Sequence, residues 1–146
     1  MAFIRQRNKM DCGVAALAML CDATYEEAYQ AVPWRREGIL NGVCTKQLRA
    51  GGLKLGYRTE STPQNRLKLI TAPPGWPRRI DHTIWSLIPN NSLVKLPQLL
   101  GARGWHWVVW RKKKIYDPAR GVFKPEKYGD WYPSSYMEFI EETDNV

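Results

Sequence analysis

The sequence predicts an α+β fold in which helices come first and an antiparallel sheet follows. An apolar stretch at residues 14–21, just after Asp11, is typical of a buried helix. Residues 92–96, 105–110 and 114–117 are short runs rich in β-branched and aromatic residues, the composition that favours strands. No internal repeat interrupts this order, so we expect the helices to pack on one sheet.

The first expected helix covers residues 12–21. Asp11 is a good N-cap, which places Cys12 in the first turn. The helix is apolar nearly all round, and such a helix is buried centrally rather than laid on the surface.

Two more helices are expected in the first third of the chain. Thr24 and Glu27 have the spacing of a capping box, and the helix that they begin should end before Pro33. A third helix at residues 45–50 should close at residues 51–52, where a Gly-Gly pair favours a left-handed cap.

The remaining elements are less regular. Residues 53–59 alternate like a strand, whereas residues 60–91 are rich in proline and break regular structure, apart from a short strand expected at 83–88. Residues 133–142 are expected to form a closing helix. Its inward-facing side chains would be Tyr136, Phe139 and Ile140.

Bulk composition limits the possible classes of protein. A chain of 146 residues with 44% apolar and 25% charged residues fits a single globular domain over residues 1–146 and excludes a disordered chain. No apolar run is long enough to cross a bilayer, so we expect a soluble protein. Three cysteines without paired spacing or a secretory segment favour a reduced, cytoplasmic setting, and they predict no metal and no cofactor.

The net charge of +8, together with seven Trp and seven Tyr, leaves a second class open. A basic surface with aromatic residues can bind nucleic acid. The only basic run, residues 111–114, also fits the solvated tip of a hairpin. The charge is therefore compatible with an acidic partner without identifying one.

Cys12 is the candidate nucleophile. The amides and the dipole at a helix N-terminus favour a thiolate there, and Gly13 leaves the backbone open to a substrate carbonyl. The alternative for a single cysteine is a buried, packed thiol. Cys21, at the far end of the helix, fits that alternative, and Cys44 fits either role.

His106 and Asp117 are the candidate base and its orienting carboxylate. If Trp110 and Ile115 pair across the hairpin, the two residues share one face of the sheet as diagonal neighbours. A two-residue turn after Trp110 would put them directly opposite, and a three-residue turn would place them on opposite faces. A histidine satisfied by a backbone carbonyl is the alternative for His106.

Two other residues are candidates for the same site. His82 lies beside its own carboxylate and is a rival base, but it occurs in an irregular segment. The amide side chain of Gln6 can donate, with the backbone N–H of Cys12, to the oxyanion of a tetrahedral intermediate.

These residues together resemble a known family. Gln6 and the motif at residues 11–19 are similar to the N-terminal motif of the bacteriocin-processing, double-glycine leader peptidases of the papain clan. Residues 106–110 and 115–119 resemble that family's His-bearing strand and Asp-Pro strand. The resemblance covers about two thirds of the chain.

The resemblance implies a papain-like α+β fold, with a central thiol-bearing helix packed on an antiparallel sheet. By it, Cys12 would be the nucleophile, His106 the general base and acid, Asp117 the orienting residue and Gln6 the oxyanion donor. It implies a thiol hydrolase, most simply a cysteine peptidase acting on a peptide or isopeptide bond of a protein substrate.

Three further expectations concern the substrate-binding residues, the organisation of the chain and the alternative function. Gly13, Trp105 and Trp107 are the expected substrate-binding residues. The family's peptidase domain is commonly joined to a membrane transporter, whereas this chain is expected to act as a stand-alone domain with a remodelled groove. The alternative function is a papain-like binding module, with little or no turnover, for an acidic protein or a nucleic acid.

Overall fold

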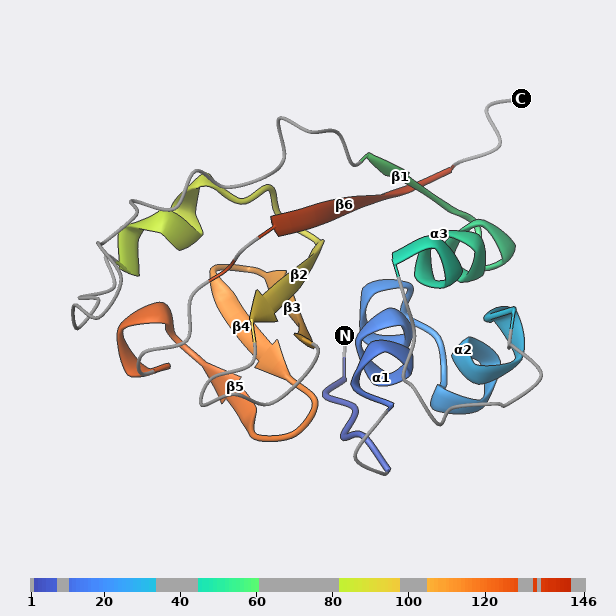
Figure 1. The fold of residues 1–146 in the computed structure, drawn as a ribbon, viewed down its shortest axis with the longest axis horizontal. Helices are drawn as coiled ribbons and strands as arrows, with labels where there is room; N and C mark the ends of the chain where they lie inside the picture. Colours follow the sequence, from blue (N-terminus) through green and yellow to red (C-terminus); the bar gives the residue numbers. More distant parts are fainter. Residues whose placement is uncertain are drawn as a thin grey trace.

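The computed structural model describes residues 2–7, 11–33, 45–60, 82–97, 105–128, 133 and 135–142, and for residues 82–84, 97 and 105 only the backbone. In this part of the chain, three α-helices pack on a six-stranded antiparallel sheet with strand order β1-β6-β2-β3-β4-β5 (Figure 1). The predicted α+β class is confirmed. The elements are α1 (Cys12–Leu20), α2 (Tyr25–Ala31), α3 (Thr45–Lys54), β1 (Tyr57–Glu60), η2 (His82–Leu87), β2 (Ser92–Pro97), β3 (Trp105–Arg111), β4 (Lys114–Asp117), β5 (Gly121–Phe123), η3 (Pro125–Lys127) and β6 (Ser135–Glu141).

The sheet separates two hydrophobic clusters. Every residue of α1 is buried, and the helix packs on the sheet face that carries Trp107 and Val109. Val108 and Trp110, which alternate with them along β3, belong to a second cluster that contains Trp85 of η2. Because α1 is buried on all sides, its N-terminus is fixed firmly against the sheet.

Helices α1 and α2 begin where the sequence predicts. Thr24 and Glu27 form the expected capping box, with both reciprocal hydrogen bonds at 3.0 Å. Asp11 precedes α1 at the N-cap position, but its side chain does not cap the helix. Its carboxylate instead accepts hydrogen bonds from the Arg7 amide and the Tyr25 hydroxyl.

Helix α3 does not end at the glycine pair, so the predicted cap at residues 51–52 is wrong. The helix continues to Lys54, and the left-handed residue is Gly56, with φ of +90°. The pair has a packing role instead: a Cβ on Gly51 would lie 2.8 Å from Leu17 Cδ2, and one on Gly52 would lie 2.7 Å from Phe139 Cε2. The strand expected at 53–59 consequently starts only at Tyr57.

The strand expected at residues 83–88 is a 3₁₀-helix, η2. Trp85 and Ile88 are both buried, and the Ile88 amide donates to the Trp85 carbonyl at 3.1 Å. A spacing of three residues puts both side chains on one face of a 3₁₀-helix, whereas a strand would point them to opposite faces. The rest of the proline-rich segment, residues 61–81, lies outside the described residues.

The closing helix expected at residues 133–142 is also wrong, because residues 135–141 form strand β6. This strand pairs with β1 on one side and β2 on the other. Met137 and Phe139 are buried on the helix-covered face, a period of two that only a strand provides. The apolar residues of this segment fit the period of a helix as well as that of a strand. The segment is a strand because the edges of β1 and β2 are available to pair with it.

In the part of the chain that the structure describes, no helix is long and apolar enough to cross a membrane.

Candidate active site

Helix α1 places Cys12 at its first residue, where the N-terminal turn meets the sheet. The side chain is nearly buried, with 8% of its surface exposed. It hydrogen-bonds with the side chain of His106, the second residue of β3. The structure therefore brings together two residues that lie far apart in the sequence.

The β3–β4 hairpin sets the position of the carboxylate. Trp110 pairs with Ile115, as the first of the alternative registers requires, and the pairing extends to Arg111 and Lys114. This register puts His106 and Asp117 on one face as diagonal neighbours. His106 Nε2 lies 2.7 Å from Asp117 Oδ1.

Asp117 is fully buried, and its carboxylate receives three hydrogen bonds. Oδ1 accepts from His106 and from the Ala119 amide at 2.9 Å, and Oδ2 accepts from the Tyr128 hydroxyl at 2.5 Å. Burial alone would raise the pKa of Asp117, but its hydrogen bonds and the charge of His106 hold that pKa below the ordinary value. The group is therefore a fixed anion beside the imidazole ring.

The His106 ring lies between a carboxylate and a thiol. Burial by itself lowers the pKa of His106, but the hydrogen bonds to Asp117 and Cys12, with the charges of these groups, raise it to about 9. Because Nε2 faces Asp117, the other ring nitrogen, Nδ1, is left for the sulfur. A histidine held in this way can keep a proton beside the thiol and pass it to a leaving group.

Gln6 is tied to the same region through its backbone. Its amide donates to the Pro118 carbonyl at 2.9 Å, and the neighbouring Arg5 guanidinium donates to the Ala119 carbonyl at 2.9 Å. The N-terminal segment is thus attached to the turn that follows Asp117. The half-buried Gln6 comes close to this site from a position six residues before Cys12.

The other predicted site residues differ in what the structure shows. Gly13 is buried in the first turn of α1. Trp107 is only 4% exposed and packs in the helix-covered core, so substrate contact by this residue stays a prediction. The side chains of Trp105 and His82 and the whole of Cys44 lie outside the described residues.

Cys21 has the environment of a structural thiol. It is buried at the C-terminal end of α1, and burial together with the charge of Asp22 raises its pKa to about 12. A thiol with so high a pKa is a poor nucleophile near neutral pH. This fits the sequence-based interpretation of Cys21 as a packed residue.

Sequence reasoning missed Tyr128. This residue follows η3, is 3% exposed, and reaches Asp117 from eleven positions away. No sequence motif marks a lone tyrosine after Pro125. Only its burial could have revealed it, because a buried tyrosine hydroxyl requires a hydrogen-bond partner.

Sequence reasoning also missed the hydrogen bonds that the Asp11 side chain makes in place of capping α1. This carboxylate is fully buried, and it accepts from Tyr25 at 2.6 Å and from the Arg7 amide at 2.8 Å. Arg7 in turn lies over the Tyr25 ring at 3.9 Å and pairs with Glu26. These contacts tie the segment that approaches Cys12 to helix α2.

With this geometry in place, the chain can be compared with known proteins. No family model matches it, and no curated protein sequence matches it. Its structure is similar to that of a double glycine motif protease from an AMS/PCAT transporter, solved as a crystal structure in complex with the leader peptide. The TM-score is 0.59 at 16% identity, over 97% of this chain and 91% of the other.

The chain has the fold of this protease. That likeness agrees with the papain-like α+β fold expected from the family resemblance, and it extends over nearly the full length of both chains.

Among the described residues, no group of three or more His, Cys, Asp or Glu side chains lies together as metal ligands would.

Proposed function

We propose that this protein is a cysteine peptidase, a thiol hydrolase that cleaves a peptide or isopeptide bond through an acyl-thioester on Cys12. One observation carries the proposal: the His106 ring bridges the Cys12 side chain and the buried carboxylate of Asp117. Nucleophile, base and orienting group in this order form the constellation of thiol acyl transfer. A buried structural cysteine has no need of such neighbours.

In the proposed reaction, the Cys12 sulfur attacks the carbonyl carbon of the scissile bond and forms a C–S bond. The carbonyl π electrons move to oxygen, where the Gln6 side-chain amide and the Cys12 backbone N–H stabilise the oxyanion. His106 donates its proton to the leaving nitrogen as the C–N bond breaks. Water then attacks the thioester while His106 accepts its proton, which releases the acid and returns the sulfur as a thiolate.

Asp117 acts through the ring and not on the substrate. Its hydrogen bond at Nε2 orients the imidazole and stabilises the protonated form, which keeps Nδ1 toward the sulfur. Gly13, Trp105 and Trp107 are proposed to border the substrate, because each is a neighbour in sequence of Cys12 or His106.

The fold likeness supports the proposed substrate class. The similar protease was crystallised with a leader peptide. We therefore propose a peptide substrate, and a double glycine before the scissile bond is the first sequence to test.

Alkylation of the thiols tests the chemistry without knowledge of the substrate. Iodoacetamide at neutral pH should label Cys12 at least about tenfold faster than Cys21, because Cys21 is a buried thiol with a pKa of about 12. His106→Ala should slow the labelling of Cys12 and leave that of Cys21 unchanged. Equal labelling of the two thiols, or a Cys12 rate that ignores His106, would contradict the proposal.

Cleavage is tested with a peptide that carries a double glycine and is followed by mass spectrometry. The unmodified protein should cut the peptide and Cys12→Ala should not. Cys21→Ala, a matched cysteine control directly after the same helix, should retain activity. Cleavage that persists in Cys12→Ala would overturn the assignment of the nucleophile.

A further inference from the structure

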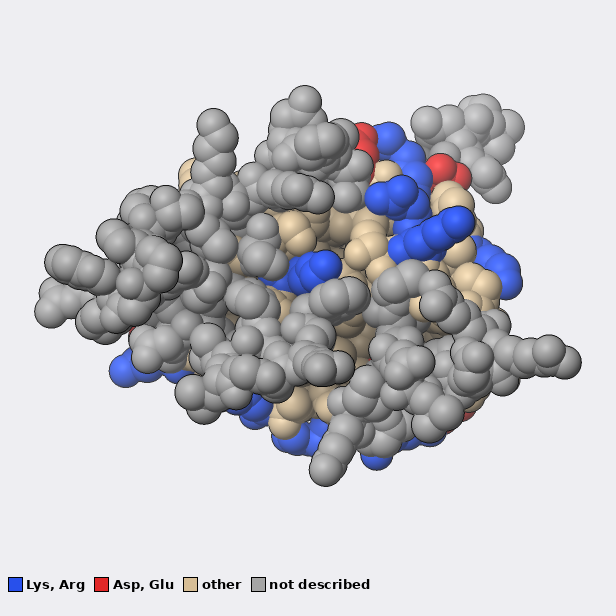
Figure 2. All heavy atoms as spheres, in the orientation of Figure 1, with Lys and Arg blue, Asp and Glu red and all other residues tan. Residues whose placement is uncertain are grey.

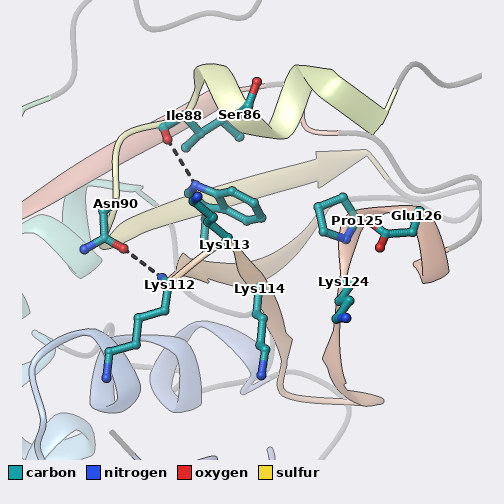
Figure 3. A pocket seen from close by; sticks show the side chains of 10 residues that line it. Ser86, Ile88, Asn90, Lys112, Lys113, Lys114, Lys124, Pro125 and Glu126 are labelled. Carbon is teal, nitrogen blue, oxygen red and sulfur yellow. Dashed lines mark hydrogen bonds between the residues drawn. The ribbon is translucent and has the colours of Figure 1, made fainter.

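An open groove lies at the far end of β3 from His106. It has a volume of about 990 Å³ and is bordered by the β3–β4 hairpin, by the end of η2 with the loop after it, and by the start of η3 (Figure 3). Trp110 and His106 are four residues apart on one strand, so roughly 13 Å of β3 separates the groove from the candidate active site. The two sites are therefore distinct.

The groove is strongly basic. Lys112, Lys113, Lys114 and Lys124 line it together with the single acidic residue Glu126, so four positive charges and one negative charge give a net of +3. All four lysines are exposed, and within the described residues none of them forms an ion pair. Figure 3 shows the Lys112 and Lys114 side chains extending from the hairpin, away from Ser86 and Ile88. Lys124, next to Pro125, extends in the same direction.

Two features of the hairpin favour a binding role over a purely structural one. Lys112 and Lys113 have φ of 52° and 60°, in a two-residue turn where Asn-Gly is the usual choice. Arg111 and Lys114 are direct cross-strand partners, and like charges at such positions are destabilising. The basic residues at the tip of the hairpin therefore lower its local stability, and residues that do so are often found at functional sites.

The floor of the groove points to the class of partner. Trp110 and Pro125 supply apolar surface, yet Trp110 is only 5% exposed and its indole N–H donates to the Ile88 carbonyl at 3.0 Å. Its ring is therefore not a platform on which a base could stack, which is what single-stranded nucleic acid requires. The nearby Arg111 is held by Asp22 at 3.1 Å, so lysines alone present the charge.

On the face drawn in Figure 2, Lys and Arg side chains predominate over Asp and Glu among the described residues, in line with the net charge of +8. An excess of one charge sign over a surface attracts partners of the opposite sign from a distance. The groove would add a defined binding site to this general attraction.

We propose that this groove docks an acidic segment of another polypeptide, with its carboxylates on the lysines and an apolar side chain against the partly exposed Pro125. Long-range attraction favours the encounter, and the apolar floor fixes the position of the segment. This docking goes beyond the proposed peptidase activity, since none of its residues belongs to the Cys12 site.

The test is fluorescence anisotropy with a dye-labelled, glutamate-rich peptide that contains one leucine. The variant is Lys114→Glu with Lys124→Glu, which reverses charges on two elements and avoids the strained turn positions. It should weaken binding by at least about tenfold. The matched control is Lys46→Glu with Lys54→Glu, which changes the net charge by the same amount on exposed positions of α3 and should alter binding by less than about twofold.

Three results would overturn the proposal. The first is unchanged affinity in the groove variant, and the second is equal weakening in the α3 control, which would indicate net charge alone. The third is tighter binding of an oligothymidylate, lost in the groove variant, which would assign the groove to nucleic acid. Labelling of Cys12 by iodoacetamide at the wild-type rate shows that a variant is folded, and Lys114→Gln replaces the double variant if it is not.

Discussion

The hydroxyl of Tyr128 donates to Oδ2 of Asp117 at 2.5 Å, on the oxygen that His106 does not use. The two carboxylate oxygens thus have separate partners, with His106 and the Ala119 amide on Oδ1. Burial and the adjacent anion raise the pKa of Tyr128 well above its usual range, so the phenol stays a donor. This arrangement fixes the plane of the carboxylate and hence the direction of its bond to His106.

Tyr128→Phe should remove one of the three donors and leave a buried carboxylate oxygen without it. We expect a loss of about 1.5–3 kcal/mol in the free energy of unfolding, the range for hydrogen bonds to charged groups. The depressed pKa of Asp117 gives stability that is present above its ordinary value of 3.8 and is lost as the pH falls through the lower folded pKa. In Tyr128→Phe the folded pKa of Asp117 should move toward its ordinary value, so this acid-dependent loss should be smaller and should be complete at a higher pH, as measured by urea unfolding at several pH values.

The Asp117→Asn background separates positioning from general packing. There, Tyr128→Phe should cost clearly less, because the charged acceptor is already gone. A cost that is the same in both backgrounds would mean that the hydroxyl acts through packing alone.

The titration of His106 gives a second prediction. Its folded pKa of about 9 lies above the ordinary value of 6.5, so its stabilising contribution is complete below pH 6.5 and is lost as the pH rises through about 9. The imidazole proton signal in NMR should therefore have its midpoint near 9. The chain contains two histidines, so His82→Ala assigns the signals.

Asp117→Asn removes the anion and most of the hydrogen-bond strength at Nε2, so the midpoint of His106 should fall toward the ordinary value. Cys12→Ser should lower it by a smaller amount. A midpoint near 6.5 in the unmodified protein would show that the ring is not held by these two neighbours.

The buried carboxylate before Cys12 gives a third prediction. Tyr25→Phe removes one of the donors to Asp11, and we expect the free energy of unfolding to fall by about 1.5–3 kcal/mol. Because Asp11 directly precedes Cys12, the proposed nucleophile, alkylation of Cys12 should slow as well. A cycle with Asp11→Asn should show coupling between the two sites, and strict additivity of the two effects would contradict it.

The glycine pair of α3 gives a fourth prediction. Alanine favours a helix interior over glycine by about 1 kcal/mol, but a Cβ on Gly52 would lie 2.7 Å from the buried ring of Phe139. Overpacking costs about 1–3 kcal/mol, so Gly52→Ala should destabilise the protein in urea unfolding. Phe139→Leu in the same chain should recover part of the loss, and a Gly52→Ala variant that is more stable than the unmodified protein would show that the ring moves aside freely.

Local signals in the sequence predicted the elements that local chemistry controls. The capping box at Thr24 fixed the start of α2, and the apolar run after Asp11 fixed α1, because caps and burial patterns are contained within a few residues. The parity of His106 and Asp117 was also predictable, since a hairpin links sequence distance directly to the face of the sheet.

Other features depended on residues far away in the chain. The segment at 135–141 contains apolar positions that suit both a helix and a strand, and only the open edges of β1 and β2 made it a strand. Gly51 and Gly52 signal a helix end in isolation, but here they admit the side chains of Leu17 and Phe139. Local propensity loses to tertiary packing in both cases.

The sequence by itself determined the α+β order, the thiol at the mouth of α1 and the shared face of His106 and Asp117. Only the tertiary structure decided that the Cys12 side chain meets that ring, that Tyr128 holds the second carboxylate oxygen, and that Lys124 joins the hairpin lysines around one groove. Spacing along a strand or helix is encoded locally. Contacts between elements are set by how their buried surfaces pack, and no short window of sequence contains them.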